Sequence, residues 1–197
     1  MERDYHALPS RALGDGAGFR RPTQARPHVT LESPAREVMT DLTRVSPATI
    51  GPQEPVVKAN QFMMARGVRL LLVIDEQERV LGVISATDVL GERPMRVATE
   101  RGLRRDELTV ADIMTPAESV EVIALADLDG MHVGHIVSTL MHAGRQHALV
   151  IDEVPESGRR MVRGILSLSQ VARQLGRPLQ PPEVARTFAE IEGLLGR

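Results

Sequence analysis

The sequence predicts an α+β fold made of two similar halves, each with the order strand, helix, strand, strand, helix. A short apolar strand runs into a serine at Gly82-Val83-Ile84-Ser85, and the same junction returns at Gly164-Ile165-Leu166-Ser167. An apolar run that ends in aspartate, 70–75, returns at 148–152, and a helical pattern that ends in glycine precedes each run. A repeat of this kind sets the organisation of the whole chain before any single element is assigned.

The composition is that of an ordinary globular protein, with 197 residues, 42% hydrophobic and 25% charged. A net charge of −2 and 2% aromatic residues argue against a surface for nucleic acid or an anionic membrane. The absence of cysteine excludes disulfides, thiolate metal sites and a cysteine nucleophile. No apolar run approaches the roughly 20 residues of a membrane span, and no signal peptide is evident, so we expect a cytoplasmic protein.

The chain divides into five segments. Residues 1–33 carry scattered proline, glycine and arginine without any period, which predicts a flexible N-terminal arm. The two repeats are expected at 34–91 and 109–176. Between them, residues 92–108 are charged in both signs and predict a solvated, partly helical linker. The tail 177–197 is expected to form a helix over 183–195, whose apolar face covers the core or a second subunit.

Each repeat is assigned by hydrophobic period and by its turn residues. In the first repeat, Ser33-Pro34 predicts the start of a helix, and Gly67 predicts the end of another. The order helix, strand, helix, two hairpin-paired strands and helix is expected over 33–39, 42–45, 55–66, 70–74, 79–84 and 85–90. In the second repeat, the corresponding strand, amphipathic helix and two strands are expected over 120–125, 133–141, 148–151 and 161–166.

These motifs together resemble the CBS domain, a family named after cystathionine β-synthase. The resemblance covers about residues 34–176. It is carried by Met39-Thr40, Val73-Ile74-Asp75 and GVISATD (82–88), and again by Met114-Thr115-Pro116, Val150-Ile151-Asp152 and Gly164-Ile165-Leu166-Ser167. It implies a Bateman module: two CBS repeats packed with pseudo-two-fold symmetry, small mixed sheets flanked by helices, two clefts between the repeats, and association of two modules as a dimer. The usual ligands of the family are AMP, ADP and ATP, and sometimes S-adenosylmethionine.

The resemblance places a nucleotide at the first junction. In the family the motif hydroxyl meets the phosphate and the aspartate takes the ribose hydroxyls, which assigns these roles to Ser85 and Asp88. A helix N-terminus also presents free N–H groups to a phosphate, and Thr87 offers a further donor. The second repeat is expected to form the opposite wall of this cleft. The resemblance places Thr115 and Val120 near the base, and Arg145 and Gln146 near the phosphates.

The second junction departs from the pattern, because Gln170 stands where Asp88 stands in the first. An amide lacks the charge-assisted bonds to ribose, which are roughly twice as strong as neutral ones. We therefore expect the second cleft to bind weakly, to stay empty or to take another ligand. Its predicted lining is Thr40, Val45, Val68, Arg69, His147, Ser167 and Gln170.

Plainer interpretations stand beside these. Ser85 and Asp88 suffice as simple helix caps. The histidines at 132, 135, 142 and 147 are expected to be surface or packing residues rather than metal ligands, and the Asp-x-Asp-Gly at 127–130 is too short for a calcium loop. The sequence contains no G-x-S-x-G, no P-loop lysine and no dinucleotide fingerprint, so no enzyme activity is expected.

The sequence thus favours a stand-alone regulatory module that binds AMP, ADP or ATP, with S-adenosylmethionine as a further ligand, and signals to a protein partner by conformational change. A homodimer is expected, without a required cofactor and without a membrane. The alternative is a ligand-free scaffold for dimerisation or protein interaction. Nucleic-acid binding through the arginines of 93–105 is a third hypothesis, which the acidic residues among them oppose.

Overall fold

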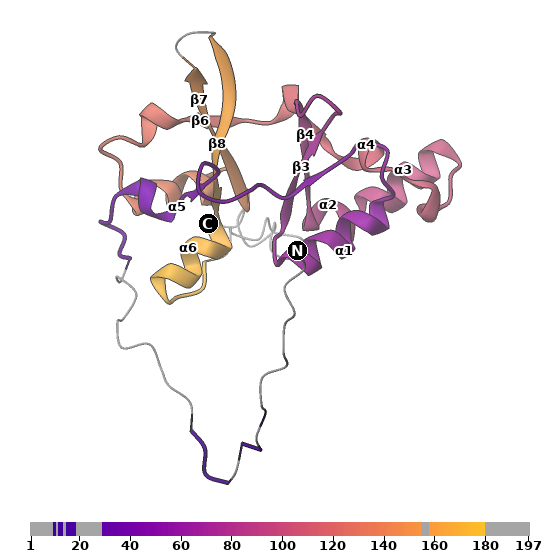
Figure 1. The fold of residues 1–197 in the computed structure, drawn as a ribbon. Coiled ribbons are helices and arrows are strands. Elements are labelled where there is room, and N and C mark those ends of the chain that lie inside the picture. The colour runs from indigo at the N-terminus through magenta and orange to yellow at the C-terminus, as the bar shows by residue number, and fades with distance from the viewer. Residues whose placement is uncertain (1–9, 11, 14, 19–28, 155–157, 180–197) are drawn as a thin grey trace, which may run out of the picture.

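The computed structural model describes residues 10, 12–13, 15–18, 29–154 and 158–179 of the chain. Two four-stranded mixed sheets lie next to each other, and the helices of each half lie on the outer side of its sheet (Figure 1). The residues up to Leu90 form η1 (Ala35–Val38), β1 (Thr40–Asp41), β2 (Thr49–Ile50), α1 (Val56–Arg66), β3 (Leu70–Ile74), β4 (Val80–Ser85) and α2 (Ala86–Leu90).

A helical segment, α3 (Arg93–Arg101) and η2 (Arg105–Glu107), connects this half to the second. The second half begins with α4 (Val110–Ile113), β5 (Thr115–Pro116), η3 (Ala117–Ser119), β6 (Val122–Ala124) and η4 (Leu125–Leu128). It continues with α5 (Val133–His142), β7 (His147–Val154), β8 (Arg159–Ser167) and α6 (Leu168–Leu175). The predicted order of strand, helix, strand, strand and helix is therefore present in both repeats.

Strand β3 is apolar throughout because both of its faces are buried. Leu71 and Val73 point into a core formed with the helices of the first half. Leu70 and Leu72 point the other way, into a smaller cluster that also contains Leu149 of β7. This small cluster joins the inner faces of the two sheets, and a separate core lies under α5 and α6. The two repeats thus pack sheet against sheet.

The repeats also exchange edge strands. The first sheet has the order β2-β3-β4-β5, so its last strand comes from the second repeat. The other sheet has the order β1-β8-β7-β6, so its edge strand comes from the beginning of the first repeat. Both exchanged strands pair antiparallel, with Thr115 opposite Val83 and Thr40 opposite Ile165. The exchange brings residues 40 and 115 to the ends of the two duplicated junctions.

The glycine of each junction is explained by this exchange. A Cβ on Gly82 would lie 2.3 Å from the carbonyl oxygen of Thr115, inside the contact distance of any real atom pair. A Cβ on Gly164 would lie 2.4 Å from the Met39 sulfur and 3.0 Å from the Thr40 carbonyl oxygen. Glycine therefore allows the exchanged edge strand to approach the sheet.

Three predictions of local structure were wrong. The strand expected at 42–45 is a turn, because the Asp41 carboxylate accepts the N–H and hydroxyl of Thr43 at 2.8 and 2.7 Å. The helix expected from Ser33 is present as the short 3₁₀-helix η1, but Ser33 does not cap it, because its hydroxyl accepts the N–H of Thr30. Residues 29–33 are not an arm, since Val29 is buried and two carbonyls of this segment accept N–H groups of α5.

The predicted linker 92–108 is also more than a solvated connection. Helix α3 packs against the first core through Pro94 and Ala98, and Leu108 is fully buried there. The sequence did not predict this packing, because the segment contains many charged residues and few apolar ones. The tail helix expected at 183–195 lies outside the described residues. No helix in the described ranges is both long and apolar enough to cross a bilayer.

Candidate functional site

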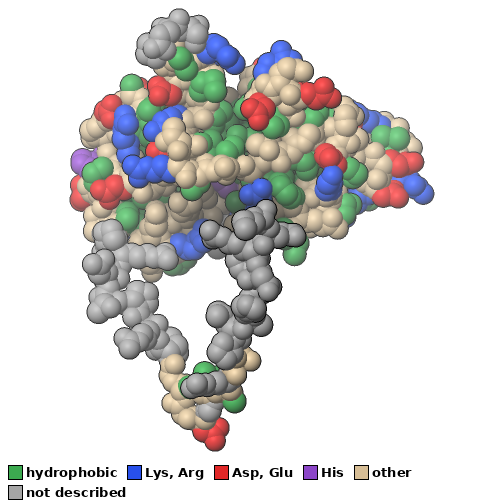
Figure 2. Space-filling view, in the orientation of Figure 1, with side chains coloured by type: hydrophobic (Ala, Val, Ile, Leu, Met, Phe, Trp, Pro, Cys, Tyr) green, Lys and Arg blue, Asp and Glu red, His purple; other side chains and the backbone are tan. Residues whose placement is uncertain are grey.

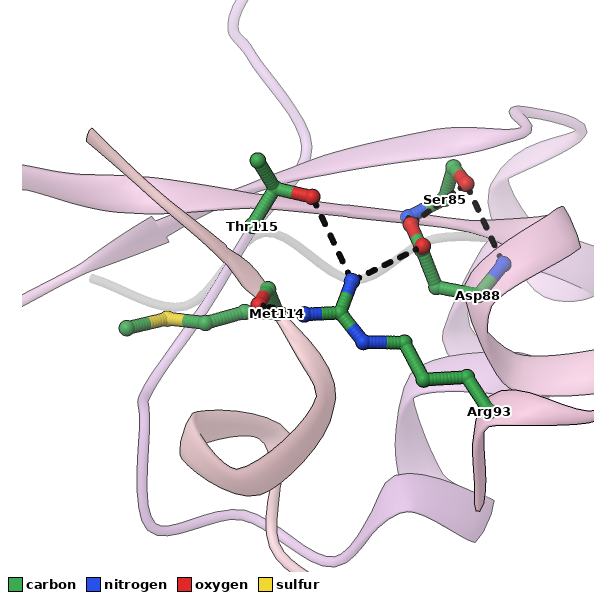
Figure 3. Close-up of polar contacts among 5 residues, drawn as sticks. All are labelled: Ser85, Asp88, Arg93, Met114 and Thr115. Atoms are coloured by element: carbon green, nitrogen blue, oxygen red, sulfur yellow. Dashed lines mark hydrogen bonds and ion pairs between the residues drawn. The ribbon is translucent and has the colours of Figure 1, made fainter. Parts of the chain in front are cut away.

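The first strand-to-helix junction is held by a capping box. The backbone N–H of Ser85 donates to Asp88 Oδ2 at 2.8 Å, and the Ser85 hydroxyl donates to the same oxygen at 2.6 Å (Figure 3). In return, the N–H of Asp88 donates to Ser85 Oγ at 3.3 Å. These bonds fix the carboxylate at the first turn of α2, where the side chain remains 21% exposed.

An arginine from α3 joins this junction to the second repeat. Arg93 Nη1 lies 3.3 Å from Asp88 Oδ1 and 3.5 Å from the Thr115 hydroxyl, and Nη2 donates to the Met114 carbonyl at 2.9 Å (Figure 3). The guanidinium therefore touches one residue of the first repeat and two of the second. The sequence analysis missed this residue, because its surroundings have the composition of a charged linker.

A cavity of about 490 Å³ opens beside the junction, and we call it the inter-repeat cavity. Its walls come from both repeats. All seven residues predicted for the first cleft line it: Ser85, Thr87, Asp88, Thr115, Val120, Arg145 and Gln146. Apolar and polar residues that the prediction did not include complete the wall: Leu70, Val83, Ser119, Glu121, Gly144, His147, Ala148 and Leu149. The structure thus brings the predicted residues together in one place.

The charges of the inter-repeat cavity lie at opposite walls. Asp88 stands on the side of the first repeat, and Arg145 stands on the side of the second, where it pairs with Glu121 at 2.9 Å. Burial, together with the positive charge of Arg69, lowers the pKa of His147 to about 4, against a smaller opposite effect of Asp88. His147 is therefore neutral near pH 7 and offers one donor and one acceptor.

His147 was predicted for the second cleft, and the structure places it on the wall of the inter-repeat cavity. It is the first residue of β7, directly after Arg145 and Gln146, and it pairs with Ser167 of β8. It therefore lies between the two junctions. The sequence did contain an indication of this position, because His147 directly follows Arg145 and Gln146, which were predicted for the first cleft.

The second junction has a different set of contacts. Gln170 accepts a hydrogen bond from the Thr40 hydroxyl at 3.1 Å, and the hydroxyls of Ser167 and Ser169 lie 3.1 Å apart. Ser167 makes no side-chain cap bond to α6. The neutral amide thus forms a single bond to the exchanged strand, where the first junction has a carboxylate with several partners.

A second cavity of about 1170 Å³ lies beside β1, β8 and α6, and we call it the edge cavity. It is lined by Val29, Arg36, Glu37, Met39, Asp41, Arg44, Arg163, Gln170, Arg173, Gln174 and Gly176. Of the residues predicted for the second cleft, only Gln170 lines it; Thr40 reaches Gln170, and Val45 is 49% exposed. The other members, Val68, Arg69 and Ser167, are not part of this wall.

Ion pairs hold several charges of the edge cavity. The Arg163 guanidinium and the hydroxyl and N–H of Thr43 hold the pKa of Asp41 well below its usual range. Arg36 pairs with Asp129 at 2.6 Å. Among the described residues, no group of three or more histidines and carboxylates is arranged to hold a metal ion.

Comparisons with known proteins identify the fold. Residues 35–94 match the model of the CBS domain family. An uncharacterised conserved protein from Pyrococcus horikoshii has a TM-score of 0.54 at 22% identity, over 77% of this chain and 98% of that chain. The CBS domain pair of protein MJ0100, in complex with 5′-methylthioadenosine and S-adenosyl-L-methionine, has a TM-score of 0.50 at 18% identity, over 74% and 97%.

A third solved structure, the CBS-domain containing protein ATU1752 from Agrobacterium tumefaciens, has a TM-score of 0.50 at 18% identity, over 70% of this chain and 93% of that chain. A search of curated protein sequences gives no significant match. The family match in the first repeat, the internal duplication and the shared fold lead to one conclusion. Residues 35–94 match the CBS domain, and the chain as a whole has the fold of a tandem CBS domain pair, a Bateman module.

Proposed function

We propose that the protein is a regulatory module that binds an adenosine compound in the inter-repeat cavity. The ligand would stabilise one arrangement of the two repeats, and a protein partner would respond to that arrangement. A ligand shifts such an equilibrium only by the difference in its affinity for the two states. We assign the module no catalytic role and no required cofactor.

The observation that carries this proposal is the composition of the cavity wall. Its volume of about 490 Å³ falls within the range of small-molecule sites, which is roughly 300–1,000 Å³. Apolar side chains such as Leu70, Val83 and Leu149 can cover a flat base, and Asp88 can accept from a ribose hydroxyl. Arg145 stands on the opposite wall, where it can donate to a phosphate.

The ligand class is supported by this arrangement and by one similar structure. Protein MJ0100, whose CBS domain pair shares the fold, holds 5′-methylthioadenosine and S-adenosyl-L-methionine. Both compounds contain adenosine, as do AMP, ADP and ATP, which we propose as the ligands here. A phosphorylated ligand suits the arginine at the far wall, and S-adenosylmethionine is the further candidate.

We further propose that two modules associate as a homodimer in the cytoplasm. Large apolar side chains are exposed on adjacent helices of the first repeat: Val57 (51%) and Met64 (75%) on α1, and Leu90 (64%) on α2. On the face shown in Figure 2, acidic and basic side chains are interspersed with hydrophobic ones over both halves. A second copy that covers α1 and α2 would remove these side chains from water.

The experiment is a thermal unfolding series with AMP, ADP, ATP, GTP and S-adenosylmethionine. A ligand at 100 times its dissociation constant stabilises the folded protein by about 2.7 kcal/mol, which gives a clear rise in Tm. Asp88→Ala is expected to weaken binding by at least about tenfold, since a hydrogen bond to a charged group contributes roughly 1.5–3 kcal/mol.

Asp112→Ala is the matched control for this substitution. Asp112 forms the same capping box with Thr109, at 2.8 Å to both the N–H and the hydroxyl, and it also pairs with an arginine, but it does not line the cavity. Both variants lose a helix cap, which costs about 1 kcal/mol. Only Asp88→Ala should lose affinity for the ligand. Equal affinities in the two variants would refute the site.

The second candidate function is a ligand-free scaffold for dimerisation or protein interaction. The capping box favours it, because the same arrangement at Asp112 serves α4 outside the inter-repeat cavity. Asp88 is likewise explained as a cap that Arg93 ties to the second repeat. If none of the compounds in the panel raises Tm, the scaffold becomes the better account.

A further inference from the structure

Arg93 lies behind the inter-repeat cavity, not on its wall. The guanidinium contacts Asp88 and Thr115, which both line the cavity, yet Arg93 is not among the lining residues. Its shortest contact is from Nη2 to the Met114 carbonyl oxygen, at 2.9 Å. Met114 is the residue directly after α4. The side chain is one third exposed, so it is partly shielded from water.

These contacts leave defined hydrogen-bonding capacity for a ligand. Asp88 Oδ2 already accepts two bonds from Ser85, and Oδ1 accepts one from Arg93. A carboxylate has about four acceptor sites, so about one remains, on Oδ1. Thr115 Oγ1 accepts from Arg93, which leaves its hydroxyl proton free to donate into the cavity. Arg93 thus contacts two neighbouring groups of the cavity wall, one from each repeat.

The charge of Arg93 matters as much as its geometry. The cavity wall carries the carboxylates of Asp88 and Glu121 and the single guanidinium of Arg145, while His147 is neutral near pH 7. Glu121 pairs with Arg145, which leaves Asp88 as the acidic charge that Arg93 offsets. Without Arg93, the field of Asp88 would repel an anionic ligand in the same cavity.

At the second junction, the matching sequence position does not hold an arginine. Arg93 lies eight residues after Ser85, and the residue eight positions after Ser167 is Leu175. The position of Asp88 is there taken by Gln170, which is neutral. The carboxylate and the arginine at these two matching positions therefore occur together at the first junction only.

We propose that Arg93 is a positioning residue that makes the inter-repeat cavity select phosphorylated adenosine compounds over uncharged ones. It offsets the charge of Asp88 toward the phosphate, whereas the two bonds from Ser85 hold the Asp88 carboxylate in place for the ribose. This inference rests on the proposed function. It adds the charge class of the ligand and the residue, outside the cavity wall, that determines it.

The test compares AMP with 5′-methylthioadenosine, which lacks the phosphate, by isothermal titration calorimetry at low ionic strength. Arg93→Gln is expected to weaken AMP binding by about 3- to 10-fold and to change 5′-methylthioadenosine binding by less than about twofold. Arg93→Lys, which retains the charge, should keep the wild-type ratio of the two affinities within about threefold. Added salt should reduce the effect on AMP.

Arg96→Gln is the matched control, because Arg96 lies on the same helix and pairs, within the described part of the chain, with exposed Glu100 alone, at 3.9 Å. It should leave both affinities unchanged. If Arg93→Gln weakens both compounds equally, or neither, the charge-selection role is refuted, although the wild-type protein still binds. If the wild-type protein binds neither compound, the proposed function itself fails.

Discussion

The two strand-to-helix junctions share a backbone and differ in chemistry. Both have a glycine opposite an exchanged edge strand, and both continue from a serine into a helix. At the first, the Asp88 carboxylate accepts three hydrogen bonds, two from Ser85 and one from Arg93. At the second, Gln170 has one neutral bond, from Thr40. The duplicated glycine therefore serves the fold, whereas the residue three positions after the serine sets the charge of each junction.

This difference separates two kinds of information in one short motif. The close approach of β5 to β4, and of β1 to β8, is a steric condition that both repeats must meet. The carboxylate at this position is an electrostatic feature that is present in the first repeat alone, where Asp88 corresponds to Gln170 of the second. A motif search that scores the whole segment equally would treat the two sites as alike. The contacts show that they are not.

The largest effect is expected where the two junctions agree. Gly82→Ala places a methyl group 2.3 Å from a backbone oxygen of β5, which cannot move away without loss of strand pairing. We expect a loss of about 2–4 kcal/mol in the free energy of unfolding, measured by urea denaturation. Gly164→Ala meets the flexible Met39 side chain first, and should cost about 1–2 kcal/mol.

Gly51→Ala is the control for these substitutions, because its Cβ would make an ordinary contact at 3.7 Å with a side-chain carbon of Glu54. Equal costs at positions 82 and 164 would show that strand exchange is equally rigid in the two sheets. That result would contradict the difference expected here, in which the new methyl group meets a backbone oxygen at position 82 and a flexible side chain at position 164.

The next effect concerns His147, which lies between the two junctions. Its pKa is about 4 in the folded protein and about 6.5 in the unfolded chain, so the unfolded chain binds more protons between these values. The contribution of neutral His147 to the free energy of unfolding is therefore fully present above pH 6.5, and it is lost as the pH is lowered toward 4. We expect a loss of roughly 1–3 kcal/mol, where the lower figure allows for the solvent that reaches the ring.

His147→Gln should flatten the stability profile between pH 6.5 and 4, as followed by urea denaturation at several pH values. Asp75 and Asp112, whose pKa values are lowered by hydrogen bonds and by Arg79 and Arg101 respectively, lose their stabilising effect only as the pH falls below about 3.8. Their contribution thus lies below the window of His147. A wild-type slope that survives in the variant would show that another group is responsible.

Much of this comparison was visible in the sequence, because the repeat spacing aligns Ser85 with Ser167 and Asp88 with Gln170. The motif, with the resemblance to the CBS domain, predicted seven residues that the structure places around one cavity. Long apolar runs such as 70–74 were assigned correctly, since burial on both faces leaves a strong pattern.

The features that were missed are those without a pattern. The exchanged strands β1 and β5 have two residues each, too few for any period. Arg93 stands in a run of charges that is typical of a linker, and only the fold shows that it reaches Asp88 and Thr115. His147 lies on a strand, β7, whose side chains alternate between two faces. Which cavity it lines is decided by the packing of the two sheets, and the sequence pattern does not show that packing.

The smallest effect is expected from an attempt to make the second junction resemble the first. Gln170→Asp places a carboxylate in the first turn of α6, three residues after Ser167, where it can form the capping box that the wild-type helix lacks. It can still accept from Thr40, but no arginine stands at the equivalent of position 93. The free energy of unfolding should rise by about 0.5 kcal/mol in urea denaturation, without a gain in affinity for AMP. A gain in AMP affinity would mean that the carboxylate alone creates a site, and that Arg93 is dispensable at the first junction as well.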